Sequence, residues 1–204
     1  MLIDFLGVLI LLTAFEMLVQ SYVKQMINTV AIQSILLALL LGILGFERCS
    51  IELYVLAVLT FIVRGLAIPE LMRVDVRKRK IWEIREVETR VPALIIFGIL
   101  LAVIGFAFYA TKLYPIFGVK GGAMPIILLL LGFLMIIARR NALAQMIGYI
   151  VEENALLYAG VTLTHLPMIL EAGVFLDLLG LVLIGVLLSA EKEYGVLELE
   201  ELVG

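Results

Sequence analysis

The stretch ARRNALAQMIGYIVEENALLYAG, residues 138–160, decides the fold class of this chain. Two arginines open it, and a largely apolar run of about 20 residues follows, which is the length that a helix needs to cross a bilayer. Glu152, Glu153 and Asn154 lie in the middle of that run. Carboxyl groups at the centre of an apolar helix are costly, so they indicate either a partner or a task inside the membrane.

The composition of the whole chain indicates the same environment. Hydrophobic residues make up 64% of its 204 residues and charged residues 16%, whereas soluble domains are about half apolar and about a quarter charged. A soluble chain of this length could not bury so much apolar surface. The first residues, MLIDFLGVLILL, lack the basic region and the cleavage site of a signal peptide, so we expect the first apolar run to remain as a helix. The sequence therefore predicts an integral membrane protein.

The residue types that hold metals and clusters are scarce. Cys49 is the only cysteine and His165 the only histidine, which leaves no disulfide framework and no ligand set for zinc or an iron–sulfur cluster. The sequence also lacks a glycine-rich dinucleotide or phosphate loop and a catalytic triad. We expect no cofactor and no metal site, and a chain that is not catalytic alone.

Seven apolar segments are long enough to be membrane helices, which predicts an all-α, polytopic transmembrane bundle. They lie at about 2–22, 26–46, 51–72, 92–113, 122–138, 141–163 and 167–189. The fifth segment is short, and we expect Gly121, Gly122 and Pro125 to bend or loosen its start.

A shift of 120 residues lays part of the chain on itself. Gln25-Met26-Ile27 then matches Gln145-Met146-Ile147, and Gln33 falls on Glu153. Chance matching of apolar sequences is one explanation; we favour a duplication of a three-helix unit, which one intervening helix makes a parallel repeat. The expected organisation is a first unit at 1–72, a basic linker at 73–91, an intervening helix and loop at 92–121, a second unit at 122–190 and an acidic tail at 191–204.

Basic residues are distributed unevenly between the two sides of the expected bundle. The N-terminal side has Arg48, Lys112 and Lys120, and the opposite side has Lys24, Arg73, Arg77, Lys78, Arg79, Lys80, Arg85, Arg90, Arg139, Arg140 and Lys192. Because cytoplasmic loops are enriched in Lys and Arg, we expect the N-terminus outside the cell membrane and the C-terminus in the cytoplasm. Two explanations of the basic linker at 73–91 stay open: it is a topology signal alone, or it is also a docking face for a cytoplasmic partner. Nucleic acid is not an expected partner.

Four of the expected helices carry ionisable groups at depth. These groups are Glu16, Arg64, the neighbours Glu152 and Glu153, and Asp177. At 1.5 Å per residue, Glu153 lies about 18 Å from the start of its helix, near the middle of a ~30 Å hydrocarbon core. Small residues three and four positions away indicate close helix packing, so the groups face protein and not lipid.

Three interpretations of these charges remain open. A buried acid–base pair of Arg64 with Asp177 or Glu153 would hold helices together. A protonatable relay is favoured because the acids outnumber the single arginine, and substrate binding by a carrier is the third interpretation. Glu16 is weaker evidence for a relay because it lies close enough to the cytoplasmic end to reach water.

The segments RRNALAQMIGYIVEEN and GVFLDLLGLVLIGVLL resemble hydrogenase-4 component E, a membrane subunit of formate hydrogenlyase-type complexes. In the first half, SYVKQM, AIQS and FIVRGLAIP are similar to the same family, so the resemblance spans nearly the whole chain. The C-terminal unit is also similar to the K-type subunit of complex I and to the C-type subunit of Mrp antiporters.

The resemblance implies an ion path lined by carboxylates on neighbouring helices. Asp177 matches the second of them, with Asp in place of Glu. The first is displaced: the complex I glutamate falls on Ile150, and the component E glutamate falls on Glu153. Arg64 stands where the family has a basic residue, and Glu152 either assists Glu153 or faces a helix contact.

The resemblance also implies partners and a function. The partners would be the lipid bilayer, other membrane subunits, and a cytoplasmic arm that contains iron–sulfur clusters and a [NiFe] hydrogenase. In such a complex this chain contributes buried carboxylates to a path for H⁺ or Na⁺ that is coupled to electron transfer. An independent secondary transporter and a purely structural membrane anchor are the alternatives.

Overall fold

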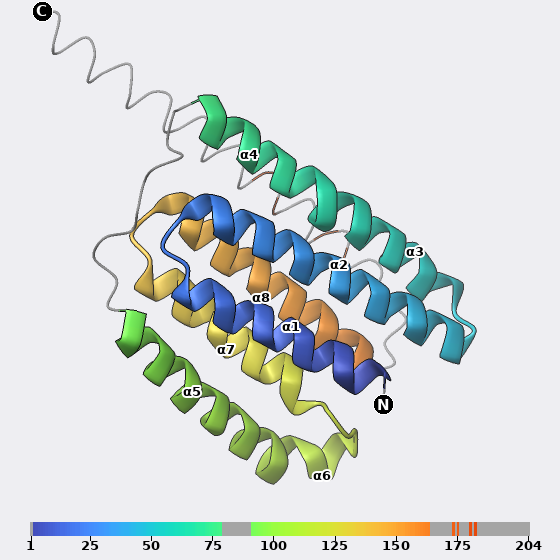
Figure 1. The fold of residues 1–204 in the computed structure, drawn as a ribbon. Helices are drawn as coiled ribbons and strands as arrows, with labels where there is room; N and C mark the ends of the chain where they lie inside the picture. Colours follow the sequence, from blue (N-terminus) through green and yellow to red (C-terminus); the bar gives the residue numbers. More distant parts are fainter. Residues whose placement is uncertain are drawn as a thin grey trace, which may run out of the picture.

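The computed structural model describes residues 2–78 and 91–163, together with Gly173, Phe175, Gly180 and Val182. Within this part of the chain every regular element is a helix, and the helices lie side by side in one bundle (Figure 1). Successive long helices run in opposite directions. The predicted all-α class and membrane-type helical bundle are therefore confirmed.

The helices have the following bounds. The first two are α1 (Leu2–Val19) and α2 (Val23–Arg48). One continuous rod contains α3 (Ile51–Thr60), η1 (Phe61–Ala67) and α4 (Ile68–Lys78), and a second contains α5 (Val91–Phe108), η3 (Tyr109–Leu113) and α6 (Tyr114–Phe117). The bundle then continues with α7 (Ala123–Ala138) and α8 (Ala142–Leu163).

Four helical stretches are long and apolar enough to cross a membrane: Leu2–Val19, Val23–Arg48, Ile51–Val74 and Val91–Phe117. The apolar α7 is shorter, with 16 residues. Helix α8 has 22 residues, enough for a membrane crossing, and its polar centre lowers its hydropathy. These helices lie at the first six predicted ranges. The range 167–189 lies outside the described residues except for the four named above, so the total of seven stays a prediction.

Local sequence explains where several helices begin and end. Ser50 caps α3, because its side chain accepts a hydrogen bond from the Leu53 amide at 3.4 Å. Asn141 caps α8 in the same way, and accepts from the Leu143 amide at 2.9 Å. Helix α7 begins at Ala123, directly after Gly122, and the turn before it contains Gly121, whose φ of +86° favours glycine. Pro125 lies in the first turn of α7, where the missing N–H has no helical partner to lose.

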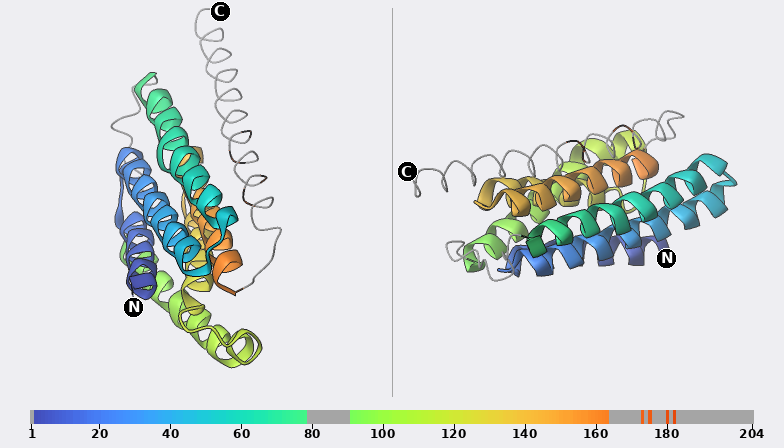
Figure 2. Two further views of the ribbon diagram at one scale, coloured as in Figure 1. Left: turned by 90° about the vertical axis from the view of Figure 1, so that its right-hand side faces the viewer. Right: turned by 90° about the horizontal axis from the view of Figure 1, so that it is seen from above.

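The layering of the bundle decides which helices surround its interior. The rod α3–η1–α4 lies on one flank and α5 on the other, with α1, α2, α7 and α8 between them (Figures 1 and 2). Only 17% of the most apolar window of the α5 rod is buried, compared with 61% of the window in α2. The outer flanks therefore present apolar side chains to their surroundings, whereas Gln33 and Ser34 of α2 and Glu153 and Asn154 of α8 are buried within the bundle.

The helix bounds agree with the proposed shift of 120 residues. Shifted α1 covers 122–139, where α7 lies, and shifted α2 begins at 143, next to the start of α8. Helices α1 and α7 run in the same direction, as a parallel repeat requires (Figure 1). The third members of the two units cannot be compared, because most of 171–190 lies outside the described residues. The duplication and the domain division stay predictions.

Candidate functional site

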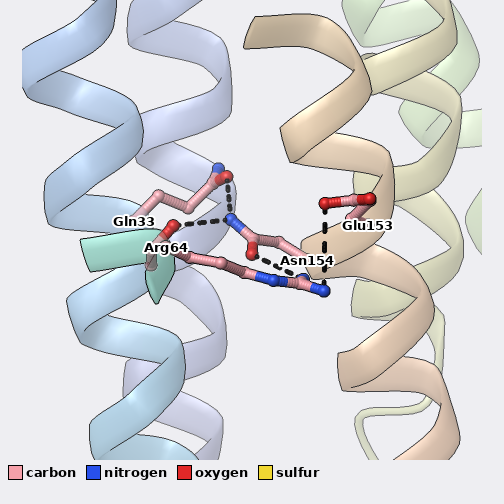
Figure 3. A network of polar contacts seen from close by, with 5 residues as sticks. Gln33, Arg64, Glu153 and Asn154 are labelled. Carbon is pink, nitrogen blue, oxygen red and sulfur yellow. Dashed lines mark hydrogen bonds and ion pairs between the residues drawn. The ribbon is translucent and has the colours of Figure 1, made fainter. Parts of the chain in front are cut away.

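Arg64 of η1 and Glu153 of α8 meet at the centre of the bundle (Figure 3). The guanidinium nitrogen Nη2 lies 3.8 Å from the carboxylate oxygen Oε2, and the side chains are 0% and 1% exposed. The distance is longer than the roughly 2.7–2.9 Å of a charge-assisted hydrogen bond, so the contact is a loose ion pair. Of the two acids that the sequence left open as partners of Arg64, the structure brings Glu153 to it. Asp177 lies outside the described residues.

Arg64 lies in the middle of a seven-residue π-helical segment, Phe61–Ala67. Such segments are rare and occur frequently at functional sites, because the wider turn changes the direction in which its side chains point. The next residue, Gly65, lets η1 approach α2 closely: a Cβ at Gly65 would lie 3.1 Å from Cγ1 of Ile35. The guanidinium of Arg64 can therefore extend past α2 to α8.

Asn154 connects this ion pair to α2. Its Oδ1 accepts a hydrogen bond from Nη1 of Arg64 at 3.2 Å. Its Nδ2 donates to Oε1 of Gln33 at 3.2 Å and to Oγ of Ser34 at 3.1 Å. All of these side chains are 0% exposed. The guanidinium of Arg64 is thus shared between a neutral carboxamide and the Glu153 carboxylate, as Figure 3 shows.

The network continues from α2 to α1. Nε2 of Gln33 donates to Oγ1 of Thr13 at 3.2 Å and to the Ile10 carbonyl at 3.3 Å. Thr13 in turn donates to the same carbonyl at 2.7 Å. Four elements, η1, α8, α2 and α1, are therefore joined by polar side chains inside an apolar bundle. Because interactions between polar groups are strong in such a low-dielectric interior, this network specifies how the four elements pack.

Gly180 lies beside the Glu153 carboxylate. A Cβ at Gly180 would lie 3.3 Å from both carboxylate oxygens, so a larger residue there would crowd the carboxylate. Tyr149 lies one turn before Glu153 on α8, and its hydroxyl is close enough to interact with that carboxylate. In the sequence, Asp177 precedes Gly180 by three residues.

Glu152 points to another neighbour, helix α7. A Cβ at Gly132 would lie 2.7 Å from Cγ of Glu152 and 3.1 Å from the Gly148 carbonyl, so the two helices are in close contact here. Oε1 of Glu152 is buried and has no hydrogen-bond partner among the described residues. Of the two roles considered for Glu152, this placement favours the helix contact.

Glu16 lies apart from the buried pair. It is exposed near the end of α1, where its carboxylate accepts a hydrogen bond from Nε2 of Gln20 at 2.9 Å. Gln20 also donates to Oγ1 of Thr29 at 2.7 Å. The structure thus brings Arg64 and Glu153 together and places Glu152 and Glu16 on other surfaces.

Sequence reasoning missed two features of the interior. Gln33, Ser34 and Thr13 were not singled out as a network, although the shift of 120 residues had already placed Gln33 on Glu153. Arg139 was counted only as a cytoplasmic charge, but it is 1% exposed and donates to the carbonyls of Met17 and Leu18 at 2.9 and 3.0 Å. No local pattern around Arg139 indicates that it reaches the end of α1.

A carboxylate beside a fixed guanidinium in a membrane interior can exchange a proton or a small cation, because the neighbouring positive charge lowers the cost of its charged form. The arrangement therefore suits ion exchange as well as helix packing. Comparison of the chain with models of known protein families, with curated proteins and with solved structures finds no significant match.

Proposed function

We propose that this chain is a membrane-arm subunit of a [NiFe] hydrogenase assembly of the formate hydrogenlyase type, and that Glu153 takes up and releases H⁺ or Na⁺ within it. The observation that carries this proposal is the ion pair of Arg64 with Glu153, fully buried at the centre of a membrane-type bundle. Removing two charges from water costs several kcal/mol for each ion, so a bundle that needed only packing would gain more from apolar residues.

The geometry of the pair favours ion exchange over a structural clamp. A clamp would be expected to join Arg and Glu by two short, parallel hydrogen bonds. Here the closest approach is 3.8 Å, and Nη1 of Arg64 is directed to Asn154 at 3.2 Å. The guanidinium lowers the cost of a charged carboxylate at Glu153 without occupying it fully. A proton or Na⁺ can then bind and leave.

The resemblance to hydrogenase-4 component E supplies the rest of the proposal. It rests on the RRN turn, on Glu153 and Asp177, and on the FIVRGLAIP segment around Arg64. Electron transfer in the cytoplasmic iron–sulfur and [NiFe] arm would drive ion movement through the membrane subunits. The apolar outer flank of α5 suits contact with lipid or with neighbouring membrane subunits.

The proposed orientation follows from the basic residues. With eleven basic residues on the linker side and three on the other, the linker and the C-terminus are placed in the cytoplasm. In a chain whose native Cys49 is replaced by Ser, cysteines introduced at positions 78 and 198 should resist an impermeant thiol reagent added to intact cells, and a cysteine at position 118 should react. The reverse labelling pattern would overturn the orientation.

The test of function is Glu153→Gln in the assembled complex, with Glu16→Gln as the matched control on an exposed carboxylate. We expect Glu153→Gln to leave dye-linked hydrogenase activity intact and to lower coupled ion movement at least tenfold, because a carboxamide can neither bind nor release a proton near neutral pH. Glu16→Gln should change ion movement less than about twofold.

The remaining outcomes separate the alternatives. Normal ion movement in Glu153→Gln would favour a structural anchor. Recovery of the chain as a stable monomer that carries a solute into proteoliposomes would favour a secondary transporter. If Glu153→Gln does not assemble, Glu153→Asp tests the same carboxyl chemistry: it should assemble and retain partial ion movement.

A further inference from the structure

The hydrogen bonds that join Arg64 to α1 all point in one direction. Arg64 donates to Asn154, Asn154 donates to Gln33, and Gln33 donates to Thr13. Thr13 then donates to the main-chain carbonyl of Ile10, where the chain of donors ends. Hydrogen bonds in such a series polarise one another, with the acceptor oxygens directed toward the cation. The series therefore holds the Arg64 guanidinium in place from the side of α1 and α2.

The two carboxamides in this series have no free donors. A carboxamide has two N–H donors and one oxygen acceptor. Among the described residues, Asn154 uses its donors on Gln33 and Ser34, and Gln33 uses its donors on Thr13 and the Ile10 carbonyl. Each carboxamide oxygen accepts from the preceding residue of the series. Both side chains are 0% exposed, so protein atoms surround them.

A carboxamide in this state does not pass a proton onward. Transfer through it would require the oxygen to gain one proton while the nitrogen releases another to the next acceptor. That exchange leaves the unstable imidic acid form, which must then reverse before the next transfer. A carboxyl group in the same position has no such obstacle, because it gains and loses a proton on its oxygens.

We propose that Asn154 and Gln33 form a proton barrier on the α1–α2 side of Glu153. Ion exchange at Glu153 is thereby confined to the side that carries Tyr149 and faces Gly180. This inference rests on the proposed function and adds the direction from which Glu153 is reached.

The polar residues beyond the barrier show why one is needed. On α1, Glu16 is exposed and lies one turn after Thr13; on α2, Thr29 lies one turn before Gln33. Gln20 joins Glu16 to Thr29 by hydrogen bonds of 2.9 and 2.7 Å. Without the barrier these groups would connect one end of the bundle to Glu153. A proton could then cross without any coupling to electron transfer.

The experiment replaces both carboxamides by carboxyls of the same shape, as Gln33→Glu with Asn154→Asp, in the assembled complex in liposomes. A potassium gradient with valinomycin imposes a membrane potential, and an enclosed pH-sensitive dye reports passive proton flux. We expect the double variant to raise this flux at least tenfold. Adding Glu153→Gln should return the flux to the parent value, because the leak passes through Glu153.

Two further variants keep the test decisive. Gln20→Glu adds a carboxyl outside the barrier and should leave the flux unchanged. Gln33→Glu alone keeps the Asn154 carboxamide between Gln33 and Arg64, so it should also leave the flux unchanged. A leak in this variant would overturn the barrier even if the double variant does not assemble.

The outcomes separate the barrier from the proposed function. Unchanged flux in the double variant, or a leak that persists after Glu153→Gln, overturns the barrier. If Glu153→Gln by itself abolishes coupled ion movement and the double variant does not leak, the barrier alone is wrong. If Glu153→Gln by itself leaves coupled movement normal, the proposed function is wrong and the barrier is overturned with it.

Discussion

The hairpins α1–α2 and α7–α8 have similar helix bounds under a shift of 120 residues, but they differ in charge at the same depth. Gln33 in the first falls on Glu153 in the second, and the two side chains are 0% and 1% exposed. Gln33 is neutral and is satisfied by hydrogen bonds to α1 and α8. The charge of Glu153 needs a cation beside it. Arg64 provides that cation, and it lies on η1, which belongs to neither hairpin. Two positions that are equally buried thus differ in chemistry: Gln33 is a neutral residue that links helices by hydrogen bonds, and Glu153 is a charged one.

The largest expected loss of stability follows removal of that cation. Arg64→Leu should lower the free energy of unfolding by about 3–5 kcal/mol, because it leaves the Glu153 carboxylate buried without its guanidinium. In the neutral hairpin, Gln33→Leu should cost only about 1–3 kcal/mol, the penalty for hydrogen-bond partners left unsatisfied. Unfolding in mixed detergent–SDS micelles, followed by circular dichroism, measures both.

A double-mutant cycle makes this comparison sharper. Arg64→Leu combined with Glu153→Gln should recover part of the loss seen for Arg64→Leu alone, because no bare charge then remains in the interior. Losses that simply add would mean that the two side chains are not energetically coupled. Equal losses for Arg64→Leu and Gln33→Leu would remove the distinction between a charged and a neutral hairpin.

Helix packing gives the next largest difference. Gly132→Ala in α7 should cost about 1–3 kcal/mol, because its Cβ would lie 3.0 Å from the backbone nitrogen of Glu152. The matched control is Gly42→Ala in α2, where a Cβ meets nothing within 4 Å. Its effect should stay below about 1 kcal/mol. The same unfolding measurement tests both variants. If Gly132→Ala left the free energy of unfolding unchanged, α7 and α8 could move apart without loss of stability.

Helix capping by arginine gives the smallest difference. Arg139 is buried and donates twice to the last turn of α1, so Arg139→Met should cost about 2 kcal/mol. Arg48 is exposed and donates once to the Val161 carbonyl at 2.9 Å, near the end of α8. Arg48→Met should therefore cost about 0.5 kcal/mol. An equal effect of the two substitutions on the unfolding midpoint would contradict a role of burial in these caps.

Much of the architecture could be predicted from the sequence because helix formation in lipid is a local requirement. With no water to bond the main chain, each apolar segment must satisfy its own N–H and C=O groups, and a helix does so within the segment. The predicted start at 51 and the observed start of α3 at Ile51 agree because Ser50 caps the helix locally. The choice of Glu153 and Arg64 as candidates also followed from a local property, charge at depth in an apolar run.

The remaining features depended on contacts between distant segments. Asn154 and Gln33 are separated by 121 positions, and Arg139 and Met17 by 122. No periodicity or spacing rule reports such pairs, because they depend on which faces of which helices meet. The π-helical turn at Arg64 belongs to the same group: FIVRGLA reads as ordinary apolar helix, and its wider turn appears only where η1 packs on α2.

The sequence by itself determined that this protein is a bundle of membrane-type helices with a few costly charges at mid-depth, because hydropathy and helix length are properties of single segments. Only the tertiary structure decided that Arg64 pairs with Glu153, that Glu152 faces α7 and that Asn154 joins Arg64 to Gln33. The physical reason is that a charge or an amide is satisfied by whatever group lies within about 3–4 Å of it. Which group that is depends on helix packing and not on the order of the residues.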